Sequence, residues 1–589
     1  MITKRFRMKR IATSFAALMV FSVTFVVAQD VTLPNLAPQV VEITGELSIS
    51  FPSLSRQPLA GFNPPPRVPD IPATRSPFIG EYKQENEDLP PSPLTPPDPP
   101  SMSTVSSRTA SAGMIEAGIG RYFTGYLRAE MATPIGKSTQ FIARADINGT
   151  GGREPFPDYN EISTASNSQV AGIGIRSESG KMDFGGDVEV ARHDYGLFGA
   201  LVPGPDLDQK SPDRTIQEST ISGFMSSGSR GGSYGELFLG FGQSSVETNQ
   251  VAYPGISPEL PGLDESRFSI SGSGGVRASS GILSADFSMA RQKLSSDDAP
   301  LSSSDLNLSS GNGAVGFTLQ YSDQLSISVA ARVFGFKVEG DTPSSFDREL
   351  VYLTPEFRIG YVVSPGLTVT VANVPEFRES SYAGMYKIAP FIEHGAALQP
   401  TLAAANIFAE AAYSSRRFSL LAKAGWKDYQ NYRVIEHNSA VTAPYTAGYS
   451  SVSYEKASIF YMTAEALLDI VPSLSTGLTV DYFSGKLDNN DFEIPYLSPF
   501  SLSSFVAFDP LDGEVLLKGS IRLEAPRYRD RERTLQISRV LSLGFEATYF
   551  VTDAAAAVVG VRNLGSKTEF WDNYEMDPGI FYSGLRWRW

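Results

Sequence analysis

The chain of 589 residues has no cysteine and only three histidines. Without cysteine it has no disulfide, no thiolate nucleophile and no Cys-ligated zinc or iron–sulfur site. Three histidines leave little imidazole for catalysis or metal binding. Charged residues make up 19% of the chain, and the formal net charge is −15. Because phosphate binding needs clustered Lys and Arg, this acidic balance argues against a nucleic-acid partner.

Long apolar runs are missing beyond the first 28 residues. No later segment approaches the roughly 18 consecutive apolar residues of a membrane helix, which excludes helical spans in the mature chain. Transmembrane strands are not excluded, because they alternate apolar and polar residues and their mean hydropathy is therefore ordinary.

Residues 1–28 are typical of a cleaved export signal. Five basic residues precede an apolar stretch over 11–27, and Val26 and Ala28 fit the small-residue rule for cleavage. An uncleaved anchor helix is the alternative. Cleavage removes five positive charges and no acid, so the net charge of −15 becomes −20 in the mature chain.

Proline is concentrated in the next region, residues 29–104, where 17 of the chain's 40 prolines lie. Proline at this density removes backbone donors and favours extended polyproline II, a semi-rigid spacer. One piece, Glu46–Phe51, alternates and fits a single strand. We therefore predict a periplasmic arm with one docking element rather than a folded domain.

From residue 105 onward the chain alternates with period two. In Leu541–Tyr549 the odd positions are apolar and the even positions are small or polar, and the same pattern recurs in segment after segment. We count about 22 such segments, an even number as bacterial outer-membrane barrels require. The pattern predicts an all-β fold, a transmembrane antiparallel β-barrel over 105–589.

Short turns alternate with long polar loops between these segments. One end of such a barrel has short periplasmic turns and the other has long external loops. A soluble sandwich is the alternative, but it would not keep one face apolar and one face charged in nearly every strand. A propeller would repeat every ~40–50 residues, and no such repeat is present. The long loops are expected near 149–166, 200–218, 249–266, 294–306, 340–350, 376–402, 432–450 and 486–500.

Charges of both signs fall on the polar faces of these segments. A charge on the lumen face costs little, whereas one at the lipid midplane costs about 2–4 kcal/mol, which favours a lumen position for all of them. They form either a mutually satisfied network or a substrate path. The residues are Arg144, Asp146, Arg332, Lys423, Lys427, Lys518, Arg522, Glu524, Arg586 and Arg588.

The last strand ends in aromatic residues. Phe581, Leu585, Trp587 and Trp589 share one face of the segment, which fits lipid contact and an interfacial aromatic girdle. The same pattern resembles the C-terminal signal that outer-membrane barrels present to the barrel-assembly machinery.

Several motifs resemble the TonB-dependent receptors. They are Ile115–Gly125 with Thr133–Gly136 near the start of the barrel, and Ile494–Pro499 and Val561–Trp571 with Asp577–Gly579 near its end. Each motif alone is weak, but their order and spacing are moderately specific. The resemblance implies a 22-stranded barrel that binds or takes up a ligand across the outer membrane.

The resemblance has a gap at its N-terminal side. That family carries a plug domain of well over a hundred residues, and residues 29–104 leave no room for a complete one. Within them a short run resembles the family's TonB box, which implies pairing with a TonB-type energy transducer by strand addition. A plain docking strand is the alternative. The run is Val40, Val41, Glu42, Ile43 and Thr44.

Catalytic constellations are poor, and we expect neither an enzyme nor a cofactor. His193 near a serine on the next strand would be needed for a Ser–His hydrolase, but a histidine at the barrel rim is the simpler interpretation. Asp488, Asp491 and Glu493 are weak calcium candidates that lack the glycine of an EF-hand loop. A solvated acidic loop is the alternative there.

The sequence leaves two functions in competition. The first is ligand uptake or binding by a barrel in the bacterial outer membrane, surrounded by lipid and lipopolysaccharide. The second is a non-transporting structural or interaction barrel whose Pro-rich arm docks a periplasmic protein.

Overall fold

The computed structural model describes residues 113–589 apart from short gaps. The gaps are 136–137, 156–161, 200–211, 229–231, 250–259, 261, 279, 297–304, 341–347, 396–397, 438–448, 489–491, 512, 566–568 and 572–573. The expected export signal at 1–28 and the Pro-rich arm at 29–104, with Val40–Thr44, lie outside the described residues.

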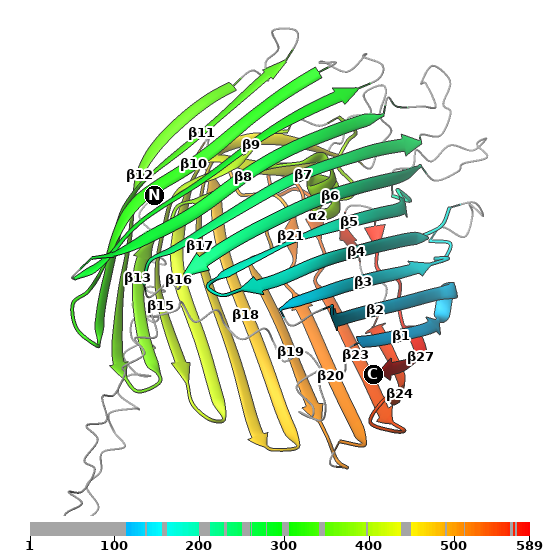
Figure 1. Ribbon diagram of the computed structural model, residues 1–589. Coiled ribbons are helices and arrows are strands. Elements are labelled where there is room, and N and C mark those ends of the chain that lie inside the picture. The colour runs from blue at the N-terminus through cyan, green and yellow to red at the C-terminus, as the bar shows by residue number, and fades with distance from the viewer. Residues whose placement is uncertain are drawn as a thin grey trace, which may run out of the picture. The chain divides into compact units, whose positions relative to one another are not determined.

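The described chain is almost entirely β-strand (Figure 1). The first half holds β1 (Gly113–Gly120), the short 3-10 helix η2 (Arg121–Phe123), β2 (Thr124–Pro134), β3 (Thr139–Thr150), β4 (Ser166–Ser179), β5 (Met182–Gly196), β6 (Asp213–Gly228), β7 (Tyr234–Asn249), β8 (Leu263–Ala278), β9 (Gly281–Ser296), β10 (Asp305–Gln320), β11 (Leu325–Gly340), β12 (Arg348–Ser364) and β13 (Leu367–Asn373). The second half holds β14 (Glu376–Arg378), helix α2 (Tyr382–Ile388), β15 (Thr401–Ser414), β16 (Phe418–His437), β17 (Ser450–Val471), β18 (Leu474–Leu487), β19 (Phe500–Phe508), β20 (Val515–Glu524), β21 (Arg527–Tyr528), β22 (Gln536–Ile537), β23 (Val540–Phe550), β24 (Ala555–Leu564), β25 (Glu569–Trp571), β26 (Tyr574–Glu575) and β27 (Ile580–Arg588).

The long strands form one closed antiparallel barrel. The sheet has 23 strands, of which β14 pairs only with β15, beyond the end of β13, so the ring itself has 22. β27 pairs with β24 on one side and with β1 on the other, which closes the ring. Closure leaves no sheet edge with unpaired backbone groups, as a strand fold in lipid requires. The predicted 22-stranded barrel is confirmed.

The register places like residues on the same face of neighbouring strands. At the closure Glu116 lies opposite Arg586, and the next pair is Ala117 with Leu585. Leu585 is 71% exposed, whereas Arg586 is 9% exposed. Since side chains alternate between the two faces, the apolar set covers the outside and the charged set lines the lumen.

The two ends of the barrel differ in their connections. The turns after β4, β8, β12 and β17 hold two residues each, whereas β3–β4, β5–β6 and β7–β8 are joined by long connections at the opposite end. The described chain begins and ends at the short-turn end, where the Gly113 amide donates to the Trp589 carbonyl over 3.0 Å.

Two loop expectations need correction. Several strands run further than the composition indicates: β6 begins at Asp213, β8 at Leu263, and β16 continues to His437. Cross-strand backbone pairing there outweighs the polar content of the segments. The connection expected as a polar loop at 376–402 instead contains β14 and α2, because its apolar side chains pack inside the barrel.

Candidate functional site

Residues 374–395, here called the inward segment, leave the end of β13 and enter the lumen. Helix α2 lies within them and begins at Ser381, whose hydroxyl accepts a hydrogen bond from the Gly384 amide over 2.9 Å. This side-chain cap satisfies one of the free amides at the helix start. The helix ends at Ala389, just before Pro390, which cannot continue it.

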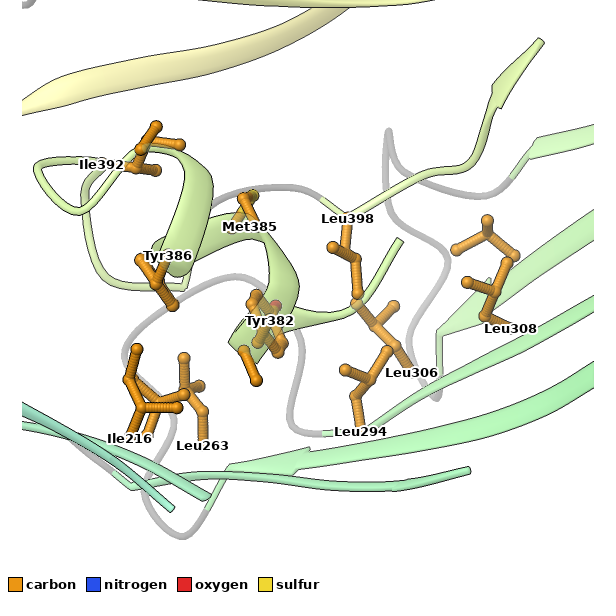
Figure 2. Close-up of a cluster of buried hydrophobic side chains, with 14 of the residues drawn as sticks. Ile216, Leu263, Leu294, Leu306, Leu308, Tyr382, Met385, Tyr386, Ile392 and Leu398 are labelled. Carbon is orange, nitrogen blue, oxygen red and sulfur yellow. The ribbon is translucent and has the colours of Figure 1, made fainter. Parts of the chain in front are cut away.

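The helix packs against apolar residues that point inward from one wall. Tyr382 and Tyr386 point towards buried side chains of β6 to β11, and Met385 belongs to the same buried cluster (Figure 2). Burying one such large side chain stabilises the fold by about 1.5–3 kcal/mol. The wall residues in this cluster are Ile216, Val246, Leu263, Leu294, Leu306, Leu308, Phe336 and Val338.

Polar contacts fix the N-terminal side of the segment to β8 and β9. The Tyr382 amide donates to a carboxylate oxygen of Glu265 over 2.9 Å. The Gln292 amide nitrogen donates to the other Glu265 oxygen over 3.0 Å and to the Ser380 carbonyl over 2.9 Å. Arg267 forms an ion pair with Glu379. The otherwise costly burial of Glu265 is thus compensated by hydrogen bonds.

The centre of the segment is fixed to β6. The buried guanidinium of Arg214 lies 4.0 Å from the centre of the Tyr386 ring and donates to the Pro390 carbonyl over 2.8 Å. Its Nε donates to Thr248 over 2.9 Å, and it has no carboxylate partner in the described part of the chain. Burial raises the pKa of Tyr386 to about 12, so this phenol stays neutral. Aromatic faces and neutral oxygens therefore hold the cation.

The far end of the segment reaches the opposite wall. Glu393 donates its amide to the Ser450 carbonyl over 2.9 Å, and the Ser450 amide donates to the Phe391 carbonyl over 2.9 Å. The Phe391 ring stacks on Tyr574, with ring centres 3.4 Å apart. Ser450 begins β17, which lies far around the ring from β6 and β8. The inward segment therefore crosses the lumen on the long-loop side and is attached to both walls.

The base of the segment is held by Lys427, one of the predicted lumen residues. Lys427 pairs with Glu376 of β14 over 2.8 Å, and Glu376 also accepts from the Asn406 amide over 2.9 Å. The Lys423 ammonium lies 3.6 Å from the centre of the Phe408 ring. The two Glu376 contacts tie β14 to β15 and β16, whereas the Lys423 contact joins β16 to β15.

The other predicted charges sit in small polar networks. Arg332 of β11 bridges Asp286 over 2.8 Å and Glu356 over 2.7 Å. Arg586 pairs with Glu116 over 2.6 Å across the closure. The remaining contacts pair Arg144 with Glu189, Asp146 with Arg128, Glu524 with Arg522 and Arg527, Lys518 with the Phe505 ring, and Arg588 with the Phe550 ring.

The C-terminal residues expected to act in assembly lie on the opposite face. Phe581, Leu585, Trp587 and Trp589 are all exposed, on the apolar outer surface. Their strand, β27, is the one that closes the ring, so its pairing completes the barrel.

The weak calcium candidates are not brought together by the described residues. Asp491 lies outside them, and Glu493 forms an ion pair with Arg533 of the β21–β22 connection. No group of three or more His, Asp or Glu with a metal-binding arrangement occurs in the part of the chain that the structure describes.

His193 does meet a serine. Its Nδ1 lies 2.9 Å from the Ser168 hydroxyl on β4, directly across the ladder. Its Nε2 is buried without a hydrogen-bond partner. A hydrolytic triad needs a carboxylate on the second imidazole nitrogen to orient the base, and this pair has none.

The inward segment is the feature that the sequence analysis missed. The sequence feature that could have revealed it is Tyr382–Ala389, a run with two tyrosines, a methionine and an isoleucine within a connection expected to be a polar loop. A solvated loop has no reason to carry such a run.

No helix among the described residues is long and apolar enough to cross a membrane.

No protein-family model matches the sequence, and no curated protein sequence matches it. Solved structures do match the fold. The iron transporter FrpB from Neisseria meningitidis (F5-1 variant) aligns with a TM-score of 0.63 at 10% identity, over 81% of this chain and 82% of its own. The siderophore receptor PirA from Acinetobacter baumannii aligns with 0.61 at 10% identity, over 81% and 80%.

The copper transporter OprC aligns with a TM-score of 0.63 at 10% identity, over 81% of both chains. These alignments confirm the barrel fold that the resemblance to TonB-dependent receptors predicts. The neighbours are transporters and receptors by description, and none of those named here is an enzyme.

Proposed function

We propose that the protein is an outer-membrane receptor that binds a ligand at the long-loop end of the barrel and takes it up through the lumen. The observation that carries this is the inward segment, which crosses the lumen and is attached to both walls by polar contacts. A barrel that served only as a scaffold has no need for a transverse closure held by reversible contacts.

Below that closure the lumen offers a polar route once the inward segment moves. Its walls carry paired charges of both signs, such as Arg332 with Asp286 and Arg586 with Glu116. A wall of satisfied ion pairs is wetted but offers few strong binding sites, which favours passage over trapping. The ligand class is taken from the fold neighbours, a chelated or free metal ion, since FrpB and OprC are described as iron and copper transporters.

Energy coupling is assigned to the arm. In this proposal Val40–Thr44 pair with a TonB-type transducer by strand addition, and the outward aromatic residues of β27 guide barrel assembly in lipopolysaccharide-containing membrane.

The test measures accumulation of iron and copper by cells that express the full chain, with ferric citrate and cupric chloride as probes. Deletion of residues 40–45 should abolish accumulation above background, while the barrel remains folded and heat-modifiable on a gel. Undiminished accumulation in that variant contradicts energy coupling. No accumulation of either metal by the unaltered protein, together with cross-linking of residues 29–104 to a periplasmic protein, supports the scaffold function instead.

A further inference from the structure

The apolar outer face of β1 to β5 is hollowed by a groove. Its lower part has a volume of about 530 Å³ and a floor of alanines, Ala129, Ala143 and Ala171. Ile115 and Ile173 stand on its sides, and Trp589 lies at its lower end. Because alanine stands among larger residues, the lipid-facing surface is hollow along this line.

The groove continues upward into a polar part. This second hollow, of about 710 Å³, shares Ala145, Ala171 and Val190 with the first. Its polar lining extends across β4 to β9 towards the long-loop end. Among the side chains there are Gln169, Arg192, Gln217, Gln243, Asp264 and Lys293.

These polar side chains share the outer face of the sheet. The register places Gln169 opposite Arg192 and Arg192 opposite Gln217, in one row across three strands. On β5 the same face carries Val188 and Val190, which are 40% and 52% exposed. The apolar and polar parts therefore form one continuous surface.

The change from apolar to polar falls at the expected membrane boundary. The outward residues of β5 are apolar or glycine from Met182 to Val190, a run of about 26 Å at ~3.3 Å per residue. At a strand tilt of ~40° this is roughly 20 Å along the membrane normal, close to the ~25 Å apolar band of such barrels. Arg192 is the first charged residue beyond it, where lipid phosphates lie.

We propose that this groove binds an anionic glycolipid, a phosphorylated sugar that carries acyl chains. One acyl chain lies over Ala143 and Ala171. One phosphate of the headgroup meets Arg192 on β5, and a second phosphate of the same headgroup lies towards Lys293, four strands away on β9. Arg192 also pairs with Asp194 over 2.9 Å, so the polar end is of mixed sign rather than a plain cationic patch. Glutamine amides and the Asp264 carboxylate supply both donors and acceptors, which sugar hydroxyls require and an acyl phosphate alone does not. The inference requires the membrane location and is independent of transport.

The test is native mass spectrometry of the purified mature protein after incubation with diphosphoryl lipid A, and separately with phosphatidylglycerol and phosphatidylethanolamine. We expect one lipid A adduct that survives activation at which the two phospholipids dissociate. The double variant Arg192→Ala/Lys293→Ala should reduce the adduct at least tenfold, and Ala171→Phe, which fills the floor, should do the same.

Two matched controls stand on other parts of the outer face. Lys456→Ala removes an exposed cation from β17, and Ala547→Phe adds the same bulk on β23. Both should leave the adduct unchanged. Equal retention of lipid A by the groove variants and the controls overturns the proposal, and so does retention of phosphatidylglycerol as strong as that of lipid A.

Discussion

The guanidinium carbon of Arg214 lies 4.0 Å from the centre of the Tyr386 ring, which joins β6 of the wall to helix α2 of the inward segment. The same side chain donates to the Pro390 carbonyl immediately after the helix. One buried residue thus contacts both the face and the end of α2. Removing it is the most direct way to loosen the closure without deleting any backbone.

Arg214→Ala should free the helix while leaving the barrel closed. The loss of a buried cation–π contact and of the hydrogen bond to Pro390 weakens the attachment by about 2–3 kcal/mol, so amide exchange over 382–389 should accelerate roughly 30- to 150-fold. Hydrogen exchange with mass spectrometry measures this. Arg562→Ala is the control, because Arg562 lies 4.6 Å from the Tyr582 ring and is not among the contacts of the segment. Equal acceleration in both variants contradicts a local role for Arg214.

Arg332→Ala should destabilise the barrel more than Arg128→Ala. The Arg332 side chain is 17% exposed and bridges two carboxylates, which its removal leaves facing each other, so we expect a loss of about 1–3 kcal/mol. Arg128 is 54% exposed and pairs with Asp146 alone, so its loss should cost about 0–1 kcal/mol. Urea unfolding in lipid vesicles compares the two. A larger loss for Arg128 would show that burial does not set the strength of these pairs.

Two neighbouring residues of β11 test which face of the strand contacts lipid and which faces the lumen. Val329 is 52% exposed on the outer face, and Ser328, the residue before it, points inward and bonds to Thr318 over 2.6 Å. Val329→Lys should therefore cost about 2–4 kcal/mol near the lipid midplane, and Ser328→Lys about 1 kcal/mol or less. Urea unfolding in lipid vesicles measures the free energy of unfolding of both variants. A larger loss for Ser328→Lys than for Val329→Lys would mean that Ser328, and not Val329, faces the lipid.

The closure should also depend on pH through Glu393. Burial raises the pKa of this carboxyl, which lies in the segment after α2. A raised pKa in the folded state means that the stability gained from the neutral acid is complete below the ordinary value of about 4.3 and is lost as the pH rises through the raised pKa. Exchange over 382–389 should therefore slow as the pH falls from 8 to about 4, after correction for intrinsic rates.

Glu393→Gln, which is neutral throughout, should reduce that dependence and protect the helix at pH 8. The ion pairs Arg267–Glu379 and Lys387–Glu218 also attach the segment to the wall, and this variant leaves all four side chains in place. If the variant keeps the full pH dependence of the unaltered protein, another group controls the closure.

Much of the barrel could be predicted because alternation is a local signal. Leu541–Tyr549 shows its two faces within nine residues, and the same period repeats around the ring. The facing of a charge such as Arg586 follows from its apolar neighbours alone. Closure then follows from the physics of strands in lipid, which forbids an open edge.

The inward segment could not be predicted in the same way. Helix α2 has seven residues, too few for a helical period or for stability in isolation. It exists because Tyr382 and Met385 find buried partners on six strands that are distant in sequence. The sequence of residues 376–402 does not indicate which wall residues face the helix inside the barrel, although its apolar run can be recognised.

We expect the inward segment to close the lumen. Single-channel conductance in planar bilayers tests it most directly, with proteins that lack residues 29–104 so that the arm does not contribute. Replacing residues 379–395 with a short Gly-Ser linker should change a low or silent conductance into large, steady openings, as expected of a wide barrel without an internal obstruction. The same conductance with and without the segment would contradict the account.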